Sequence, residues 1–191
     1  MVCLKKSILY FENAGPENTE ATIQLAKERA LELGLQDIVV ASTHGGTGLK
    51  IAEAFKDKGF NVVAVTITEG FKDEGWAMTR EERLMLQEMG VKVFTGIHAL
   101  GDDVNSAFTD KYGGKALNEV VAQTLYRFCQ GMKVCVEIVL MAADAGLIPV
   151  DREVLAIAGT DKGADTAIIV RPSYARKFLD LQIKEIIAKP R

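Results

Sequence analysis

The sequence predicts an α/β fold built on an open, doubly wound sheet. Short, continuously apolar runs, typical of strands covered on both faces, alternate with segments whose apolar residues recur at helical spacing. Several of these runs end in turns rich in Gly, Ser, Thr or Asn, where such sheets bind ligands. The 191 residues contain no repeat, linker or low-complexity tract, which predicts a single domain over residues 1–191.

The first elements are delimited by turn and capping residues. Lys5–Phe11 is predicted as a strand because Ile, Leu, Tyr and Phe follow one another at its end. A helix then begins near Asn18 or Thr19, both good N-caps, and ends at Gly34. The next strand is Asp37–Ala41, which is apolar after its first residue.

The middle of the chain continues the alternation. A helix is expected to run to about Lys58, and an apolar strand spans 61–67. After a loop, Thr79 opens a helix with capping-box spacing that ends at Gly90. A strand is expected at 91–95, and the long segment 96–114 is expected to be irregular.

The C-terminal part is predicted as two helices, two strands and a final helix. Ala116–Cys129 carries one apolar stripe, whereas Lys133–Ala145 is apolar on nearly every side. The second helix therefore lies inside the domain or in a subunit contact, and we expect a homo-oligomer. Strands follow at Glu153–Ala158 and Thr166–Val170, and Tyr174–Ala188 is expected to be helical.

The most informative stretch is the turn between the Asp37–Ala41 strand and the next helix. Three glycines allow close backbone approach, hydroxyl side chains can donate to phosphate oxygens, and the N–H groups of a helix start attract anions. The turn predicts a phosphate-binding cradle formed by Ser42, Thr43, His44, Gly45, Gly46, Thr47 and Gly48. It matches neither the Walker nor the GxGxxG pattern, and an ordinary capped turn is the alternative.

Other turns join the cradle if the sheet is parallel, because carboxyl ends of parallel strands share one edge. The predicted ligand-binding residues outside the cradle are Asn13, Gly15, Thr68, Gly159, Thr160 and Lys162. Trp76 could stack on a flat ligand or pack its own loop, and His98 has little context. The aspartates in 96–114 lack metal-loop spacing, so no metal site is predicted.

Composition excludes several classes of function. A net charge of −3 without a basic stripe argues against nucleic acid, and no apolar segment is long enough for a membrane span. Three cysteines without a CxxC pair indicate neither a disulfide framework nor a zinc site. These features predict a cytoplasmic protein.

Three segments resemble the C-terminal domain of pyruvate kinase: 18–21, 38–47 with its Ser-Thr-His-Gly-Gly-Thr turn, and 63–66. Segments 137–149, 153–160 and 165–167 resemble the end of that domain. The resemblance implies a three-layer α/β/α sandwich, mostly parallel, with the last strand antiparallel. It also implies that the cradle holds a phosphate, as the corresponding turn holds that of a sugar bisphosphate. The family usually has a basic residue where this chain has Leu49, and the catalytic barrel has no counterpart here.

The chain is also similar to a small archaeal and bacterial family with this fold. Phe-Glu-Asn-x-Gly at Phe11–Gly15 and Gly-Thr-x-x-Gly-Ala-Asp-Thr at Gly159–Thr166 carry this similarity. It implies flavin mononucleotide (FMN) as the ligand and no settled reaction. The alternative is a non-catalytic sensor of a phosphorylated metabolite such as a sugar phosphate.

Overall fold

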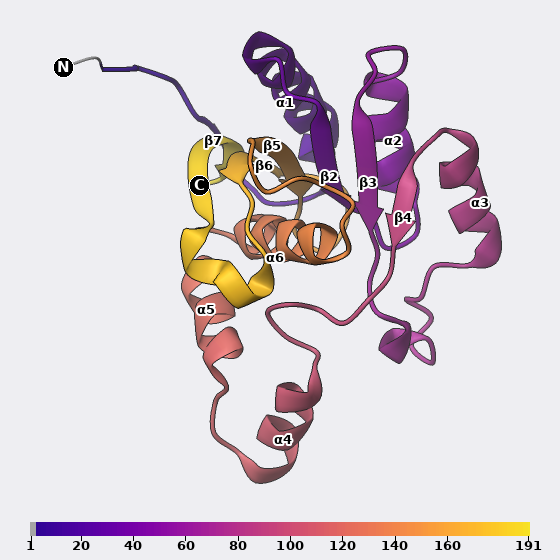
Figure 1. Cartoon of the computed structure of the whole chain (residues 1–191), viewed down its shortest axis with the longest axis vertical. Helices are drawn as coiled ribbons and strands as arrows, with labels where there is room; N and C mark the ends of the chain where they lie inside the picture. The colour runs from indigo at the N-terminus through magenta and orange to yellow at the C-terminus, as the bar shows by residue number, and fades with distance from the viewer. Residues whose placement is uncertain (1–2) are drawn as a thin grey trace.

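The structure is a computed structural model and describes residues 3–191. Its centre is a seven-stranded sheet in the order β1-β7-β6-β5-β2-β3-β4 (Figure 1). The strands are β1 (Leu9–Phe11), β2 (Asp37–Ala41), β3 (Asn61–Val65), β4 (Lys92–Phe94), β5 (Val154–Ala158), β6 (Thr166–Arg171) and β7 (Gln182–Pro190). The α-helices are α1 (Thr19–Leu33), α2 (Gly46–Ala54), α3 (Arg80–Glu88), α4 (Val104–Tyr112), α5 (Leu117–Leu125) and α6 (Gln130–Asp144). Short 3-10 helices are η1 (Pro16–Asn18), η2 (Glu69–Phe71) and η3 (Ala175–Asp180).

The sheet is mostly parallel, as expected. Strands β5, β2, β3 and β4 run in one direction, and β6 is antiparallel to β5. The expected antiparallel strand is therefore β6. Strand β7 turns back antiparallel to β6 and pairs in parallel with β1, which forms one edge of the sheet. The predicted first strand is confirmed only for its last three residues, Leu9–Phe11.

The prediction of a helix over Tyr174–Ala188 was wrong. This segment forms η3 and then most of β7, which pairs along its length with β6. The helix was predicted because Phe178, Leu181 and Ile186 are spaced as apolar residues of a helix can be. β-Branched residues also suit strands, and pairing with β6 and β1 decides between the two structures.

The segment 96–114, expected to be irregular, contains the helix α4. Asp103 caps its start, because its carboxylate accepts the backbone N–H of Ser106 at 3.0 Å. Its apolar residues Val104, Phe108 and Tyr112 are exposed instead of packed on the core. In Figure 1, α4 extends away from the sheet, so the helix does not bury its stripe as core helices do.

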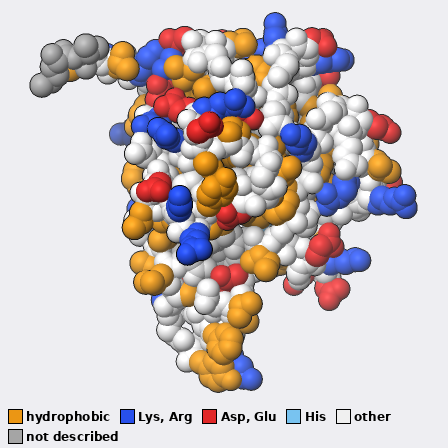
Figure 2. All heavy atoms as spheres, viewed as in Figure 1, with side chains coloured by type: hydrophobic (Ala, Val, Ile, Leu, Met, Phe, Trp, Pro, Cys, Tyr) orange, Lys and Arg blue, Asp and Glu red, His pale blue; other side chains and the backbone are white. Residues whose placement is uncertain are grey.

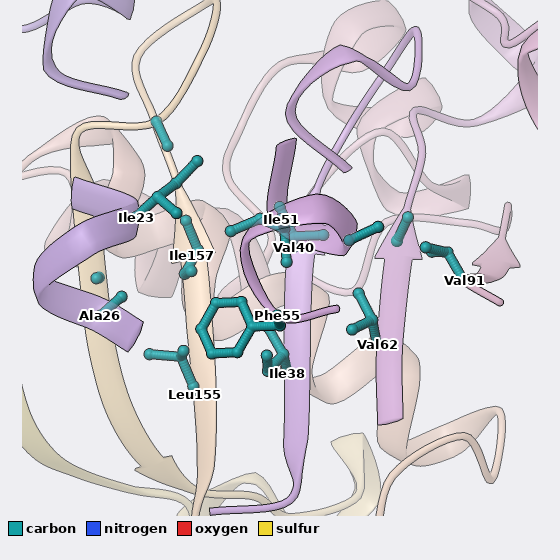
Figure 3. Close-up of a cluster of buried hydrophobic side chains, with 14 of the residues drawn as sticks. Ile23, Ala26, Ile38, Val40, Ile51, Phe55, Val62, Val91, Leu155 and Ile157 are labelled. Atoms are coloured by element: carbon teal, nitrogen blue, oxygen red, sulfur yellow. The ribbon is translucent and has the colours of Figure 1, made fainter. Parts of the chain in front are cut away.

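Two apolar layers hold the helices against the sheet. Alternate residues of β2 point to opposite faces: Ile38 and Val40 pack toward α1, α2 and α3, whereas Val39 packs toward α6. Figure 3 shows the first layer, where Phe55, the residue after α2, lies over Ile38, and Ile23 of α1 lies near Ile157. This arrangement is the expected three-layer α/β/α sandwich.

Helix α6 is buried inside the domain. Its inner side packs on β2, β3, β5 and β6, and its outer residues Val136 and Leu140 are covered by α5, η3 and the Leu100 segment. The expected burial of α6 is thus confirmed within one chain, and it no longer requires a subunit contact. Within residues 3–191, the helices are all too short or too polar to cross a membrane.

Candidate functional site

The sheet has a switch point between β2 and β5. These neighbouring strands are parallel, with Val39 opposite Ala156. The chain leaves β2 through α2 toward β3 on one side, whereas β5 on the other side is reached through α6. Ligands bind beyond the carboxyl ends of strands at such a point, because the diverging connections leave a crevice there. Turns 42–48 and 159–165 follow these two strands directly.

The turn 42–48 is a rigid helix start. Gly45 has a φ of 82°, a left-handed conformation that favours glycine, and is the N-cap of α2. The buried Ser42 hydroxyl accepts the N–H of Gly48 at 3.0 Å. A Cβ on Gly48 would lie 2.9 Å from Leu86 of α3, so only glycine lets α2 approach α3 this closely.

The remaining donors of this turn are available to a ligand. Within the described residues 3–191, the N–H groups of Gly46 and Thr47 have no protein acceptor. The half-buried hydroxyls of Thr43 and Thr47 likewise have no hydrogen-bond partner in that part of the chain. Free N–H groups at a helix N-terminus form an anion-binding site, because the helix dipole adds to their own polarity.

His44 is tied to α3 beside the cradle. Its Nδ1 lies 3.3 Å from a carboxylate oxygen of Glu82, and its side chain is 47% exposed. Burial opposes ionisation of Glu82, but hydrogen bonds from Thr79 and His44 outweigh it and lower the pKa of this carboxyl. His44 is therefore oriented by an acidic partner while it remains in contact with solvent.

The second Gly-rich turn is organised by the buried Asp165. Its carboxylate accepts the backbone N–H groups of Gly15 and Thr160, each at 3.2 Å, and the hydroxyl of Thr166 at 2.7 Å. It thereby joins the loop after β1 to the turn after β5. The Thr19 hydroxyl adds a second link by accepting the N–H of Ala164 at 3.0 Å.

The other predicted site residues lie around these two turns. The carbonyl of Asn13 accepts the side chain of Asn18, which shapes the loop before η1. Gly159 follows β5, and Lys162 is exposed at the tip of its turn. The hydroxyl of Thr68 accepts the N–H of Gly70 within its own turn. Gly15, Thr160 and the cradle thus lie at one edge of the sheet, while Thr68 begins η2 beyond β3.

Sequence reasoning missed the residues that hold this edge together. Asp165, Thr19 and Glu82 were not predicted, although Asp165 stands in the Gly-Ala-Asp-Thr stretch singled out above. Asp165 and Thr19 bind backbone groups of distant loops, and Glu82 binds the side chain of His44; no local pattern signals these distant contacts. Trp76 stacks on Phe71 with ring centroids 5.5 Å apart, so it packs its own loop.

Cavities elsewhere in the molecule do not coincide with the cradle. A groove of about 1000 Å³ lies between the N-terminal segment, α1 and β7, and one of about 380 Å³ lies beside η3. Neither is lined by a residue of turn 42–48. The cradle remains the candidate site because its donors lack hydrogen-bond partners within residues 3–191. The volume of the two grooves gives no such indication of a ligand. Among the described residues, no group of three His, Cys, Asp or Glu could hold a metal ion.

Comparison with known proteins identifies the family. Residues 20–170 match the family model described as pyruvate kinase, alpha/beta domain. The chain belongs to this family. Two solved structures of pyruvate kinase from Cryptosporidium parvum, one in complex with ADP, are 16% and 15% identical, with TM-scores of 0.41 and 0.38. The matches cover 81% and 90% of this chain but only 23% and 24% of those chains.

The family match agrees with the fold and leaves the ligand open. The observed sandwich, with its antiparallel β6, is consistent with the pyruvate kinase alpha/beta domain. The two solved structures are too distant to add to the argument, and this chain spans about a quarter of their length. The ligand must be argued from the residues at the sheet edge.

Proposed function

We propose that this protein binds FMN by its phosphate in the cradle at the start of α2. The observation that carries the proposal is the set of unsatisfied donors there: the N–H groups of Gly46 and Thr47 and the hydroxyls of Thr43 and Thr47. An anion with several acceptor oxygens matches these donors, and the dipole of α2 favours its charge. The Ser42 cap and left-handed Gly45 hold the donors in place without a ligand.

The choice of FMN among phosphorylated ligands rests on the sequence similarity at Phe11–Gly15 and Gly159–Thr166. These segments face each other across the carboxylate of Asp165, which fixes their geometry. A bound flavin would supply electron-transfer chemistry, while the protein supplies binding and orientation. We propose that the exposed Lys162 neutralises charge on the ligand.

A non-catalytic sensor of a sugar phosphate is the second candidate. The same cradle supports it, because the free donors recognise phosphate and not the group attached to it. The absorption spectrum of the purified protein separates the two candidates. A flavin spectrum supports the first, whereas a colourless protein stabilised by sugar phosphates supports the second.

The cradle is tested by removing its two free hydroxyls. We expect the double variant Thr43→Val/Thr47→Val to weaken FMN binding by about 2–4 kcal/mol, since each donor to a charged group contributes about 1–2 kcal/mol. Isothermal titration with FMN and with riboflavin, which lacks the phosphate, measures the effect. Only FMN binding should weaken.

The matched control is Thr124→Val, since Thr124 bonds the carbonyl of Val120 in its own helix. This variant should bind FMN as the wild type does. Unchanged FMN affinity in the double variant would place the phosphate elsewhere.

A further inference from the structure

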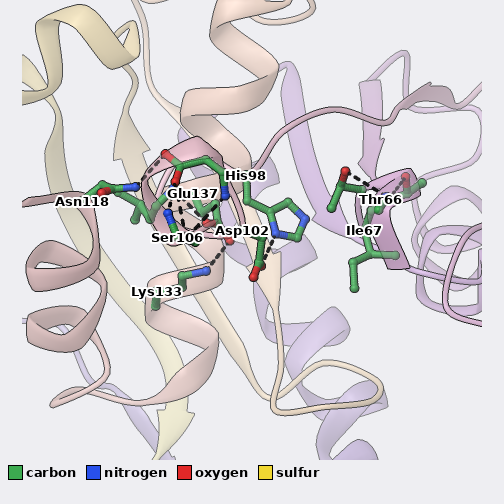
Figure 4. Close-up of polar contacts among 12 residues, drawn as sticks. Thr66, Ile67, His98, Asp102, Ser106, Asn118, Lys133 and Glu137 are labelled. Atoms are coloured by element: carbon green, nitrogen blue, oxygen red, sulfur yellow. Dashed lines mark hydrogen bonds and ion pairs between the residues drawn. The ribbon is translucent and has the colours of Figure 1, made fainter. Parts of the chain in front are cut away.

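A histidine–aspartate pair lies on the α6 side of the same sheet edge. Nδ1 of His98 lies 2.8 Å from Oδ2 of Asp102, and the His98 side chain is only 13% exposed (Figure 4). The hydrogen bond from His98 is the largest cause that lowers the pKa of Asp102. An ionised carboxylate only accepts hydrogen bonds, so the Nδ1–H of His98 donates to Asp102, and Nε2 is the second polar atom of the ring.

The second ring nitrogen faces solvent. Within residues 3–191, Nε2 of His98 has no hydrogen-bond partner. The one fully buried side-chain N or O atom without a partner in that part of the chain is Oγ1 of Thr22, so Nε2 of His98 is not fully buried. The His98 side chain as a whole is nevertheless mostly enclosed. A mostly enclosed ring with an unpaired polar atom is suited to a ligand contact, because its packing fixes its direction.

A buried ion pair holds the turn that carries this histidine. Glu137 of α6 accepts the backbone N–H of Leu100 at 3.0 Å and the ammonium of Lys133 at 2.6 Å. Both charged side chains are almost completely buried. Removing both charges from water costs free energy, so this ion pair is weak evidence that the fold gains stability from it. Its position fits another role, which is to fix the 98–102 turn on α6.

Short links connect His98 to the cradle. The backbone N–H of Ser42, the first cradle residue, donates to the carbonyl of Val65 at 2.9 Å, and Thr66 follows directly. The Thr66 hydroxyl lies 2.6 Å from that of Thr95, three residues before His98. Figure 4 shows the imidazole between α6 and the Thr66 segment, with its ring directed toward the latter. His98 therefore lies in the loop after β4, at the same edge of the sheet as the cradle after β2.

We propose that His98 contacts the ring end of the bound mononucleotide through Nε2, with Asp102 as the residue that positions the imidazole. The inference rests on the proposed function, because the phosphate in the cradle directs the remainder of the ligand along the sheet edge. With Nδ1 held by Asp102, Nε2 is the polar ring atom left to pair with the N–H and carbonyl groups of a heteroaromatic ring, such as the imide of flavin. A sugar phosphate offers no such ring.

The experiment uses the two histidines of the chain, His44 and His98, as separate NMR reporters. Their ring signals are assigned with His44→Gln and His98→Gln, and the wild type is then titrated with FMN or inorganic phosphate. We expect FMN to shift the His98 signal, whereas phosphate leaves it unchanged because it fills only the cradle. His98→Gln should weaken FMN binding about 3- to 10-fold, as expected for one lost hydrogen bond, and leave phosphate binding unchanged.

Asp102 is tested through its effect on His98. Asp102→Ala should weaken FMN binding and alter the His98 signal. Asp102→Asn keeps an acceptor for Nδ1–H, so its FMN affinity and its His98 signal should lie closer to those of the wild type. If FMN binds in the cradle and neither the His98 signal nor the His98→Gln affinity changes, the inference is wrong and the proposed function stands. If the protein binds phosphate but not FMN, both the inference about His98 and the proposed FMN-binding function are overturned.

Discussion

Individual side chains at the sheet edge divide into residues that build the site and residues that remain free. Ser42 and Asp165 are buried, and their oxygens accept backbone N–H groups of the turns. Thr43, Thr47 and Lys162 keep their polar groups available. Sequence reasoning found the free donors because Gly, Thr and Lys in a turn indicate phosphate. It also named Ser42, but as a cradle residue; that Ser42 and Asp165 accept backbone N–H groups became visible only with the fold.

Lys162 distinguishes a ligand-facing turn from an ordinary hairpin. If its ammonium lies against the flavin ring, Lys162→Met should lower the flavin reduction potential by tens of millivolts, since 30 mV is about 1.4 kcal/mol for two electrons. If it lies against the phosphate, the variant should weaken binding of FMN but not of riboflavin. Spectroelectrochemistry and titration measure both quantities. Lys56→Met is the control, because Lys56 lies past the distant C-terminal end of α2.

No change in the potential or in either affinity for Lys162→Met would contradict the opposed-loop site.

At the scale of elements, glycines and ion pairs determine how helices approach the sheet. Gly131 in the first turn of α6 lies against Thr166, the first residue of β6, so closely that a Cβ would overlap its side chain. Arg29 of α1 forms a bidentate pair with Glu185 of β7. Both contacts join elements that are distant in the sequence.

Gly131→Ala should destabilise the protein although alanine favours helices. The new methyl group overlaps Thr166 and forces α6 away from β6, for which overpacking predicts a cost of about 1–3 kcal/mol. Urea unfolding measures the free energy. Gly46→Ala is the matched control, because it also lies in the first turn of a helix and nothing lies within 4 Å of its Cβ position. Equal stability of the two variants would show that α6 does not pack as described.

The Arg29–Glu185 pair should make stability depend on pH. The hydrogen bond from Arg29 lowers the pKa of Glu185 below its ordinary 4.5. The ionised Glu185 therefore contributes fully to the free energy of unfolding at pH values well above 4.5, and this contribution is lost as the pH falls through the lowered pKa. We expect Glu185→Gln to cost about 1–2 kcal/mol at pH 7, as for a partly buried charged hydrogen bond, and less at pH 3. Urea unfolding of both proteins at both pH values tests this.

If the unfolding free energies of the wild type and Glu185→Gln differ by the same amount at pH 7 and pH 3, ionisation of Glu185 is ruled out as the cause. Glu53→Gln is the control for a pair whose two side chains are well exposed, and it should change stability little at either pH.

The whole molecule combines a compact sandwich with one projecting apolar helix. Figure 2 shows hydrophobic side chains gathered at the lower end of the molecule, where α4 lies in Figure 1. Val104, Phe108 and Tyr112 are 69%, 61% and 71% exposed, and Leu117 of α5 is 85% exposed. Exposed apolar clusters of this kind mark contact surfaces.

The prediction of a homo-oligomer now rests on α4 and not on the Lys133–Ala145 helix, from which it was first inferred. Helix α6 is covered within the chain, but the stripe on α4 is symmetric about Phe108 at four-residue spacing. Two antiparallel copies of α4 would bring its apolar residues together in the closed two-fold contact typical of dimers. We expect a dimer in sedimentation at micromolar concentration, and monomers for Phe108→Ser/Tyr112→Ser. A monomeric wild type would contradict the prediction.

The α/β class, the family and most of the strands were predictable from the sequence, and so were the free donors of turn 42–48. These features depend on local chemistry: apolar runs define buried strands, capping residues start helices, and a Gly- and Thr-rich turn after a strand frees N–H groups for an anion. Only the tertiary structure shows that Ile183–Ile187 belongs to β7, that α6 is covered within the chain, and that Asp165 joins the loops after β1 and β5. Each of these depends on contacts between residues far apart in the chain, and a local pattern does not specify its distant partner.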